Sequence, residues 1–323
     1  MGWKGTMRSL AATARRMEKE AERKHKQQLK ERIAADASDA VSDWERYIDN
    51  LLSVHTNLTR RIDWHRMIDK PAPKQPQTKS RHSDRAMAAM VGFKPGMFDF
   101  LTGGTKKKKS ILEQNLKAAT EKDRIENERI LRKYDEDVAE WENDRSLAKR
   151  LVDGDILAMR EVISELKSLS ENDLIGSSVE FSIYENSVLA RPQVHSDEVV
   201  PSMRRKQLAS GKLSETKMPV GQFNELYQDY VASVALKVAG DLFQVLPIDE
   251  VYVTCEGEML NTATGHKAPT PILSVQFVRK TFETLNLSNI DPSDSMINFN
   301  HKMNFSKTKG FTSITPLMEP FEE

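Results

Sequence analysis

The chain has 323 residues, of which 38% are hydrophobic and 30% are charged. This length leaves room for about two domains, and the polar composition indicates a globular part that carries long solvated helices. Lys plus Arg and Asp plus Glu both total 48, so the net charge points to no class of partner. The single cysteine, Cys255, excludes an intrachain disulfide and a cysteine-based zinc site, and it favours a reducing cytoplasm.

The chain starts with MGWKGT, which matches the short acceptor pattern for an N-terminal fatty acyl chain. That pattern fixes few positions, so we interpret Gly2 and Gly5 as a flexible lead-in and Thr6 as a helix cap. No apolar run approaches the roughly 20 residues of a membrane span, and no secretory signal is recognisable. The sequence therefore predicts a cytoplasmic protein without a transmembrane segment.

Two long helices are predicted in the N-terminal half, at about 7–57 and 110–152. The first begins with a thin coiled-coil seam and continues into an apolar face formed by Val41, Trp44, Ile48, Leu51 and Leu52. Residues 1–35 contain ten Lys or Arg against four Glu. This excess permits contact with nucleic acid or an anionic membrane, whereas the interleaved charges favour a solvated or partner-packed face.

The second long helix carries apolar residues at steps of three and four: Leu131, Tyr134, Val138, Trp141, Ala148 and Val152, with Arg145 at the one polar position. Upstream, Ile111, Ala118 and Ile125 lie seven apart. We expect the two long helices to pack as an antiparallel hairpin or to pair with another chain. The connection at about 70–107 is predicted to be a linker, and the overlapping stretch 93–109 either touches a membrane surface or closes the end of the hairpin.

Near residue 176 the sequence changes from charged helical stretches to alternating polar and apolar residues. We therefore predict a helical arm over 1–175 and an α+β domain over 176–323. Asp155 is expected to cap a short helix before the boundary. The domain should hold two β-hairpins, a short helix at PSMRRKQLASGKL, two further short helices and a last strand. The stretch VGQFNELYQDYVASVALKVAGDLFQVLP is the most hydrophobic helix. We expect a mostly antiparallel sheet to pack on this long buried helix.

Several stretches carry a resemblance: the opening MGWKGT and, later, FNELYQDYV, LNTATGH, DPSDSM and KTKGF. With them the chain resembles a family of uncharacterised bacterial proteins with long charged helices. The resemblance implies a bacterial cytoplasmic setting, and it supplies no catalytic residues.

Two basic groups in the second half are candidates for binding nucleic acid. One contains Arg204, Arg205, Lys206, Lys212 and Lys217, opposed only by Glu215, and the other contains Lys302, Lys307 and Lys309. If the fold joins them, they form a patch of positive charge that binds phosphate without reading sequence.

A metal-dependent nuclease or other hydrolase is the alternative. It needs two or three carboxylates that converge on one cation, and the candidates are Glu225, Asp249, Glu256 and Glu258. The second strand lacks the Glu-x-Lys pair of restriction-type nucleases. His266 and His301 have no partner visible in the sequence, and Cys255 is interpreted as an inert structural residue.

The leading hypothesis is a non-enzymatic, macromolecule-binding or scaffold protein that uses no cofactor. Its expected partners are another protein or a second copy of the chain, bound through the coiled coil, and nucleic acid, bound through the basic patches.

Overall fold

The computed structural model divides into two compact units. The sheet unit comprises residues 1–62 and 154–323, and the helical unit comprises residues 63–153. Described are residues 3–94, 104–166, 169, 173–184, 186–260 and 265–320, with side chains from residue 23 onward. In chain order the helical unit is therefore an insertion into the sheet unit.

This division differs from the predicted boundary at residue 175. The two long helices are α1 (Trp3–Leu52) and α4 (Gly104–Val152), close to their predicted positions. However, α1 belongs to the sheet unit and α4 to the helical unit. The two long helices therefore belong to different units.

A six-stranded sheet, with strand order β1-β2-β5-β6-β7-β8, organises the sheet unit. Neighbouring strands are antiparallel except for β2 and β5, which run parallel. The strands are β1 (Ser178–Ile183), β2 (Ser187–Gln193), β5 (Glu250–Leu260), β6 (Lys267–Val278), β7 (Asn300–Ser306) and β8 (Gly310–Thr312). The predicted α+β class with a mostly antiparallel sheet is confirmed, and β1–β2 and β5–β6 are the two hairpins that the alternation predicts.

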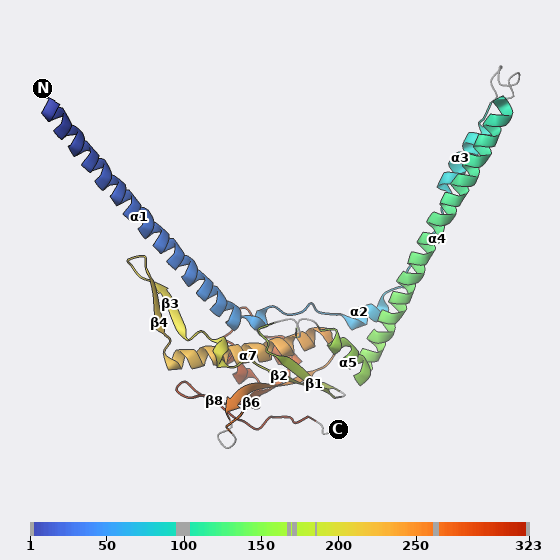
Figure 1. Ribbon diagram of the computed structural model, residues 1–323. Coiled ribbons are helices and arrows are strands. Elements are labelled where there is room, and N and C mark those ends of the chain that lie inside the picture. The colour runs from blue at the N-terminus through green and yellow to red at the C-terminus, as the bar shows by residue number, and fades with distance from the viewer. Residues whose placement is uncertain are drawn as a thin grey trace. The chain divides into compact units, whose positions relative to one another are not determined.

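Helix α7 (Val220–Val245) packs on one face of this sheet (Figure 1). Every side chain from Tyr230 to Phe243 is buried. The Cys255 Sγ lies 3.8 Å from the Val231 carbonyl oxygen, which identifies the face of β5 that α7 covers. The long buried helix expected from the sequence is thus confirmed as the core of this unit.

The opposite face of the sheet is crossed by residues 313–320. The Ile314 amide donates to the Pro271 carbonyl oxygen at 3.0 Å, and the Leu317 amide donates to Ser274 Oγ at 3.0 Å. Ser274 Oγ is also 3.0 Å from Thr254 Oγ1, and both side chains are buried. Since Thr254 precedes Cys255, it points away from α7, so this segment covers the polar face of the sheet.

The second half of α1 is an amphipathic helix docked on its own unit. Ala37, Ile48 and Leu51 are buried, at steps that keep them on one face. The Trp44 indole donates to the Met203 carbonyl oxygen at 3.0 Å, which joins α1 to β3. The apolar face predicted between Val41 and Leu52 is confirmed, whereas residues 23–33 are exposed on all sides.

A β-hairpin stands where the sequence predicts a short helix, and that prediction is wrong. Strands β3 (Met203–Gln207) and β4 (Leu213–Lys217) form a separate two-stranded sheet. Gly211, at φ 79°, closes the turn between them. Gln207 Nε2 donates to the Ala34 carbonyl oxygen of α1, so a tertiary contact outweighs the helical propensity of Lys, Gln, Leu and Ala.

The remaining elements of the sheet unit are short. Within the described ranges they are α5 (Ile156–Ser164), α8 (Arg279–Phe282) and the 3-10 helices η1 (Val54–Thr56), η2 (Asp197–Val199) and η3 (Asp294–Asn298). The Asp155 carboxylate accepts from the Leu157 and Ala158 amides, as predicted for a cap. The predicted last strand is instead the hairpin β7–β8.

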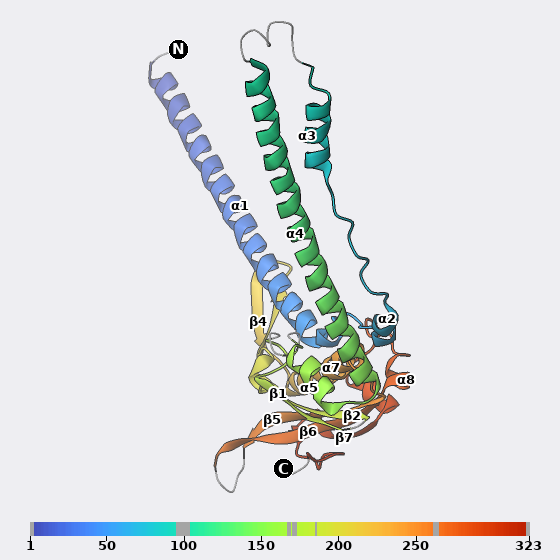
Figure 2. The same ribbon diagram turned by 90° about the vertical axis from the view of Figure 1, so that its right-hand side faces the viewer.

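In the helical unit, residues 63–91 run back along α4 (Figure 2). They include α2 (Trp64–Asp69) and α3 (Arg81–Val91), and α3 lies inside the region predicted as linker. The Trp141 indole donates to the Lys70 carbonyl oxygen at 2.8 Å, and Arg145 Nε donates to that of Ile68 at 3.1 Å. This folded-back segment covers the lower part of the predicted apolar seam.

The upper part of the predicted seam has the wrong register. Ile111 and Ile125 are 47% and 55% exposed. The buried residue at this level is Asp123, whose carboxylate accepts from the amides of His82 and Ser83 and from Ser83 Oγ. Burial alone raises the pKa of Asp123, but these hydrogen bonds outweigh it, so the pKa lies below its ordinary value. A polar contact therefore joins the start of α3 to α4 at this level.

Candidate nucleic-acid interface

The four carboxylates proposed for a metal site do not converge. Glu225 forms an ion pair with Lys307, and the Glu258 Oε2 lies 3.8 Å from Lys267 Nζ. Asp249 precedes β5, whereas Glu256 lies near its far end. Seven residues of strand separate them, which corresponds to about 23 Å. The four carboxylates therefore cannot all bind the same cation.

Glu256 has a structural partner of its own. It is 6% exposed, and the Arg191 guanidinium donates to its Oε1 from the neighbouring strand β2. The Arg191 Nη1 also lies 3.8 Å from Glu180 on β1. This row of alternating charges ties three strands together, so the hydrolase hypothesis finds no shared ion site at its own candidate residues.

In the described part of the chain, the one cluster of potential metal ligands contains none of the other candidates, Cys255, His266 and His301. Burial raises the pKa of the Cys255 thiol, which opposes formation of a reactive thiolate. The His301 Nδ1 lies 3.1 Å from the Phe299 carbonyl oxygen, next to it in the same strand region. His266 is exposed just before β6. These positions agree with a structural role for Cys255.

The two basic groups meet at the N-terminus of α7. From the β3–β4 hairpin, Arg204 Nη1 donates to Gln222 Oε1 at 3.2 Å. From the β7–β8 turn, the Lys307 carbonyl oxygen accepts from Asn224 Nδ2 at 2.7 Å, and the Lys307 ammonium pairs with Glu225. Residues about one hundred positions apart thus lie within one turn of the same helix.

The start of α7 offers backbone donors at this point. Pro219 is the N-cap residue, and no side chain caps the helix. The first amides of a helix have no partner within the helix, and its dipole places partial positive charge there. Val220 is 57% exposed, so water or a ligand can reach this end. The arrangement combines backbone donors with cationic side chains.

Strand alternation splits the predicted patch. Arg204 and Lys206 share one face of β3, since their partners across the hairpin are Thr216 and Ser214. Arg205 lies on the other face, where its Nε donates to Glu215 at 2.9 Å. Lys217 is opposite Met203 and shares that face.

Lys302 lies away from α7 as well. It is opposite Ser274 on the polar face of the sheet, and its Nζ lies 3.2 Å from the Pro316 carbonyl oxygen. Three of the eight predicted cations, Arg205, Lys217 and Lys302, therefore do not belong to the surface at the start of α7.

The hairpin turns carry two further cations. Lys212 follows Gly211 at the tip of β3–β4, and Lys309 precedes Gly310, which has φ 73°. Lys309 lines a hollow of about 260 Å³ together with Asn224, Tyr227 and Phe311. Arg204, Lys206 and Lys309 are exposed, and none forms an ion pair within the described part of the chain.

A row of buried polar residues on α7 was not recognised in the sequence. Lys237 is 3% and Asp241 0% exposed, and the Lys237 Nζ lies 2.8 Å from Asp241 Oδ2. They hold residues 53–62, which we call the strap: Lys237 donates to the Asn57 carbonyl oxygen, and Asp241 accepts from the Thr59 amide at 2.7 Å. Both charged groups therefore make contacts that hold the strap against α7.

His55 of the strap contacts the same row. Its Nδ1 lies 2.8 Å from Ser233 Oγ, and its Nε2 lies 2.9 Å from the Leu287 carbonyl oxygen. Nε2 must donate to that carbonyl, and the Ser233 hydroxyl accepts from the His55 amide at 3.2 Å and donates to the Leu52 carbonyl oxygen at 3.1 Å. The serine hydroxyl is therefore engaged and buried, which argues for packing rather than catalysis.

No helix in the described ranges is long and apolar enough to cross a bilayer. The predicted membrane-surface segment, 93–109, falls largely outside the described residues, which omit 95–103. No family model, curated protein or solved structure matches this chain. A function for this protein must therefore be inferred from the geometry of its own residues.

Proposed function

We propose that the protein binds polyanionic macromolecules, nucleic acid in the first place, and that it does so without catalysis. The binding surface, here called the α7 amino-terminal surface, comprises Arg204, Lys206, Lys307 and Lys309 with the first amides of α7. The observation that carries the proposal is the meeting of two basic hairpins at an uncapped helix N-terminus.

The chemistry of this surface suits a phosphate group. Helix N-termini bind anions because backbone donors and the helix dipole act together, and an Arg fork adds two directed hydrogen bonds. Lysine ammonium groups contact phosphate oxygens more readily than they read base edges. The proposed binding is therefore to the phosphate backbone of the nucleic acid and is largely independent of its base sequence.

The acidic neighbours set a limit on the strength of binding. Glu225 already neutralises Lys307, and Glu215 neutralises Arg205 on the other face. The three remaining cations, Arg204, Lys206 and Lys309, then give a slope of roughly −3 in a plot of log affinity against log salt on duplex DNA.

The test is fluorescence anisotropy of the full chain with duplex and single-stranded oligonucleotides, between about 50 and 200 mM salt. The variant Arg204→Ala/Lys309→Ala removes one cation from each hairpin. It should weaken binding to all sequences alike and flatten the salt slope by about two. The matched control is Lys280→Ala/Lys302→Ala, which removes the same charge from α8 and from the polar face of the sheet.

Two results would contradict the proposal. The first is no binding by the unaltered protein at the lower salt concentration, in which case the domain recognises protein. The second is equal weakening by the control variant, which would show a response to overall charge alone. We propose a cytoplasmic location with this function, supported by the buried, free thiol of Cys255.

A further inference from the structure

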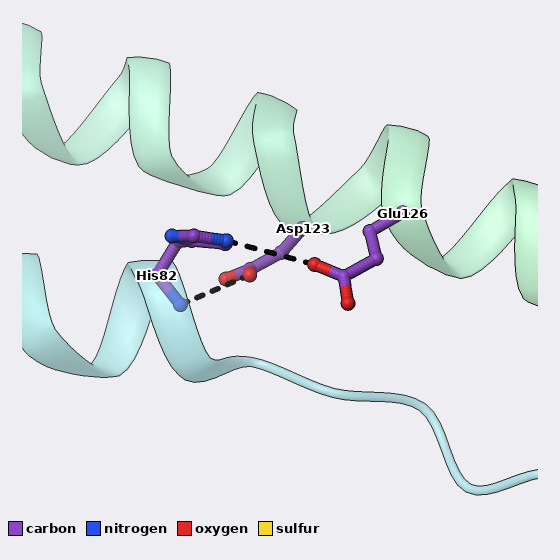
Figure 3. Close-up of side chains that lie close together, drawn as sticks. All are labelled: His82, Asp123 and Glu126. Carbon is purple, nitrogen blue, oxygen red and sulfur yellow. Dashed lines mark hydrogen bonds and ion pairs between the residues drawn. The ribbon is translucent and has the colours of Figure 1, made fainter.

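A cluster of three potential metal ligands lies between α3 and α4 in the helical unit. His82 comes from the first turn of α3, and Asp123 and Glu126 come from one turn of α4 (Figure 3). The imidazole nitrogen and the carboxylate oxygens all lie within 4.8 Å of one another. Among the described residues, no other group of this kind brings three such ligand atoms together.

We propose that His82, Asp123 and Glu126 bind one divalent transition-metal ion of the zinc class, which joins α3 to α4. One imidazole and two carboxylates form a mixed nitrogen and oxygen ligand set, which suits zinc and its neighbours better than calcium or magnesium. The two carboxylates also balance the charge of a divalent ion.

One distance in the cluster already agrees with a tetrahedral ion. Two ligands bonded at about 2.0–2.1 Å to such an ion lie roughly 3.4 Å apart. The His82 Nε2 lies 3.5 Å from Glu126 Oε2, which is already close to that separation. The other separations, up to 4.8 Å, must shorten when an ion binds, and the exposed Glu126 side chain is the carboxylate that can rotate to shorten them.

Hydrogen bonds orient the buried ligand and leave it an open position. Asp123 Oδ2 accepts from the Ser83 amide and hydroxyl at 2.7 and 2.6 Å, and Oδ1 accepts from the His82 amide alone at 3.0 Å. A carboxylate oxygen has two acceptor positions, so Oδ1 retains one. Ligating carboxylates in metal sites are commonly held in this manner.

The other two ligands are accessible to an ion from solvent. The side chains of His82 and Glu126 are 48% and 46% exposed. An ion held by three protein ligands on this surface completes its coordination with water. The consequence is structural: the ion links residues at least 41 positions apart and adds to the hydrogen bonds by which Asp123 already holds the start of α3.

The competing interpretation is a helix cap beside a simple His82–Glu126 ion pair. An ion pair needs a protonated imidazole, whereas a metal ligand must present a neutral nitrogen. Titration of the full chain with zinc chloride, measured by isothermal calorimetry, distinguishes a metal site from a simple ion pair. We expect one zinc ion per chain, with affinity lowered at least about tenfold in Glu126→Gln and in His82→Ala.

The matched controls are His65→Ala, an exposed histidine of α2, and Glu136→Gln on α4. Both should bind zinc as the unaltered protein does. Hydrogen exchange of residues 81–91 should slow when zinc is added to the unaltered protein and not when it is added to Glu126→Gln. Glu126→Gln keeps the size of an exposed side chain, so a circular dichroism spectrum checks that it folds.

The proposal is overturned if the unaltered protein shows no stoichiometric zinc binding. It is equally overturned if binding persists in both ligand variants, or if His65→Ala lowers the affinity as much as His82→Ala does.

Discussion

The buried ion pair on α7 makes a clear prediction for single side chains. In Asp241→Leu, the Lys237 ammonium would remain 3% exposed in an apolar helix without its counter-ion. Removing one partner of such a pair costs about 3–5 kcal/mol, because the remaining charge stays desolvated. We expect a fall of that size in the free energy of unfolding, measured by urea denaturation followed by circular dichroism.

The matched control is the double variant Lys237→Met/Asp241→Leu, which removes both charges and fills similar volume. It should recover most of the lost stability, since an apolar pair can replace a buried ion pair. A double variant as unstable as the single one would show that the contacts to the strap, rather than the unpaired charge, carry the effect.

His55 should make stability depend on pH in the mildly acid range. Burial lowers its pKa from the ordinary 6.5, against the opposing effect of the backbone carbonyls of Leu287 and Leu52. The unfolded chain then binds more protons than the folded one below about pH 6.5. Stability conferred by neutral His55 is complete above that pH and declines as the pH falls toward the folded pKa. Urea midpoints between pH 7.5 and 5 should fall less in His55→Gln than in the unaltered protein.

Asp229 should act in the opposite direction. Burial raises its pKa to about 6, and the nearby Asp291 and Asp294 add to this effect while a hydrogen bond from Ser293 opposes it. The folded state holds this proton more tightly than the unfolded chain, so ionisation of Asp229 above pH 6 costs stability. Asp229→Asn should therefore be more stable at pH 7.5, by about 1–2 kcal/mol after allowance for partial exposure.

The gain in Asp229→Asn should shrink as the pH is lowered from 6 toward 4, where the carboxyl of the unaltered protein is protonated. A gain that is constant over this range would contradict the assigned pKa and point to packing instead.

At the scale of elements, the two halves of α4 give a matched pair of substitutions. Trp141 is half-buried against the folded-back segment, whereas Ile125 is 55% exposed. Trp141→Glu should loosen residues 63–91, because it removes the contact with Lys70 and places a charge in the seam. Ile125→Glu should have little effect. Hydrogen exchange of residues 63–91 in the full chain measures both, and equal protection in the two variants would refute the observed register.

The sequence predicts elements well where the local pattern and the tertiary environment agree. Alternation around residues 185–186 and the apolar run of α7 both correspond to observed elements, since burial on one face or on all sides leaves a direct trace in composition. The seam of α4 was followed correctly at Tyr134, Val138 and Trp141. Upstream, the predicted row of Ile111, Ala118 and Ile125 is exposed, whereas the half-buried row is Leu112, Leu116 and Ala119 and continues to the polar residue Asp123, which breaks the apolar pattern.

The candidate surfaces were only partly predictable for the same reason. The charges of Arg204 and Lys307 are visible in the sequence, but their meeting depends on the turn of β7–β8 reaching Asn224. The face on which each lysine lies depends on hairpin register, and PSMRRKQLASGKL has a helix-like composition that hides its alternation. Likewise, His82 and Asp123 are 41 residues apart, so their contact is a tertiary fact.

At the scale of the whole molecule, the insertion of one unit into the other predicts that they can be separated. Replacing residues 63–153 with a short Gly/Ser linker should leave the sheet unit folded, because α1, the strap and α7 remain together. That variant should keep the salt-dependent affinity for nucleic acid and lose zinc binding. Anisotropy and calorimetry measure the two properties on the same sample. An unfolded product would show that the helical unit is needed for folding of the rest.

The strap also sets the order in which the chain can fold during synthesis. His55 contacts Ser233, 178 residues later in the chain. At about 5–20 residues per second, the ribosome needs roughly 10–35 s between these two positions. The helical unit is complete well before α7 emerges, so it can fold first. During this time the apolar face of α1 is exposed, because the later parts of the sheet unit that bury it have not been synthesised. A nascent chain of this protein therefore passes through a period in which its N-terminal helix is a natural client for chaperones.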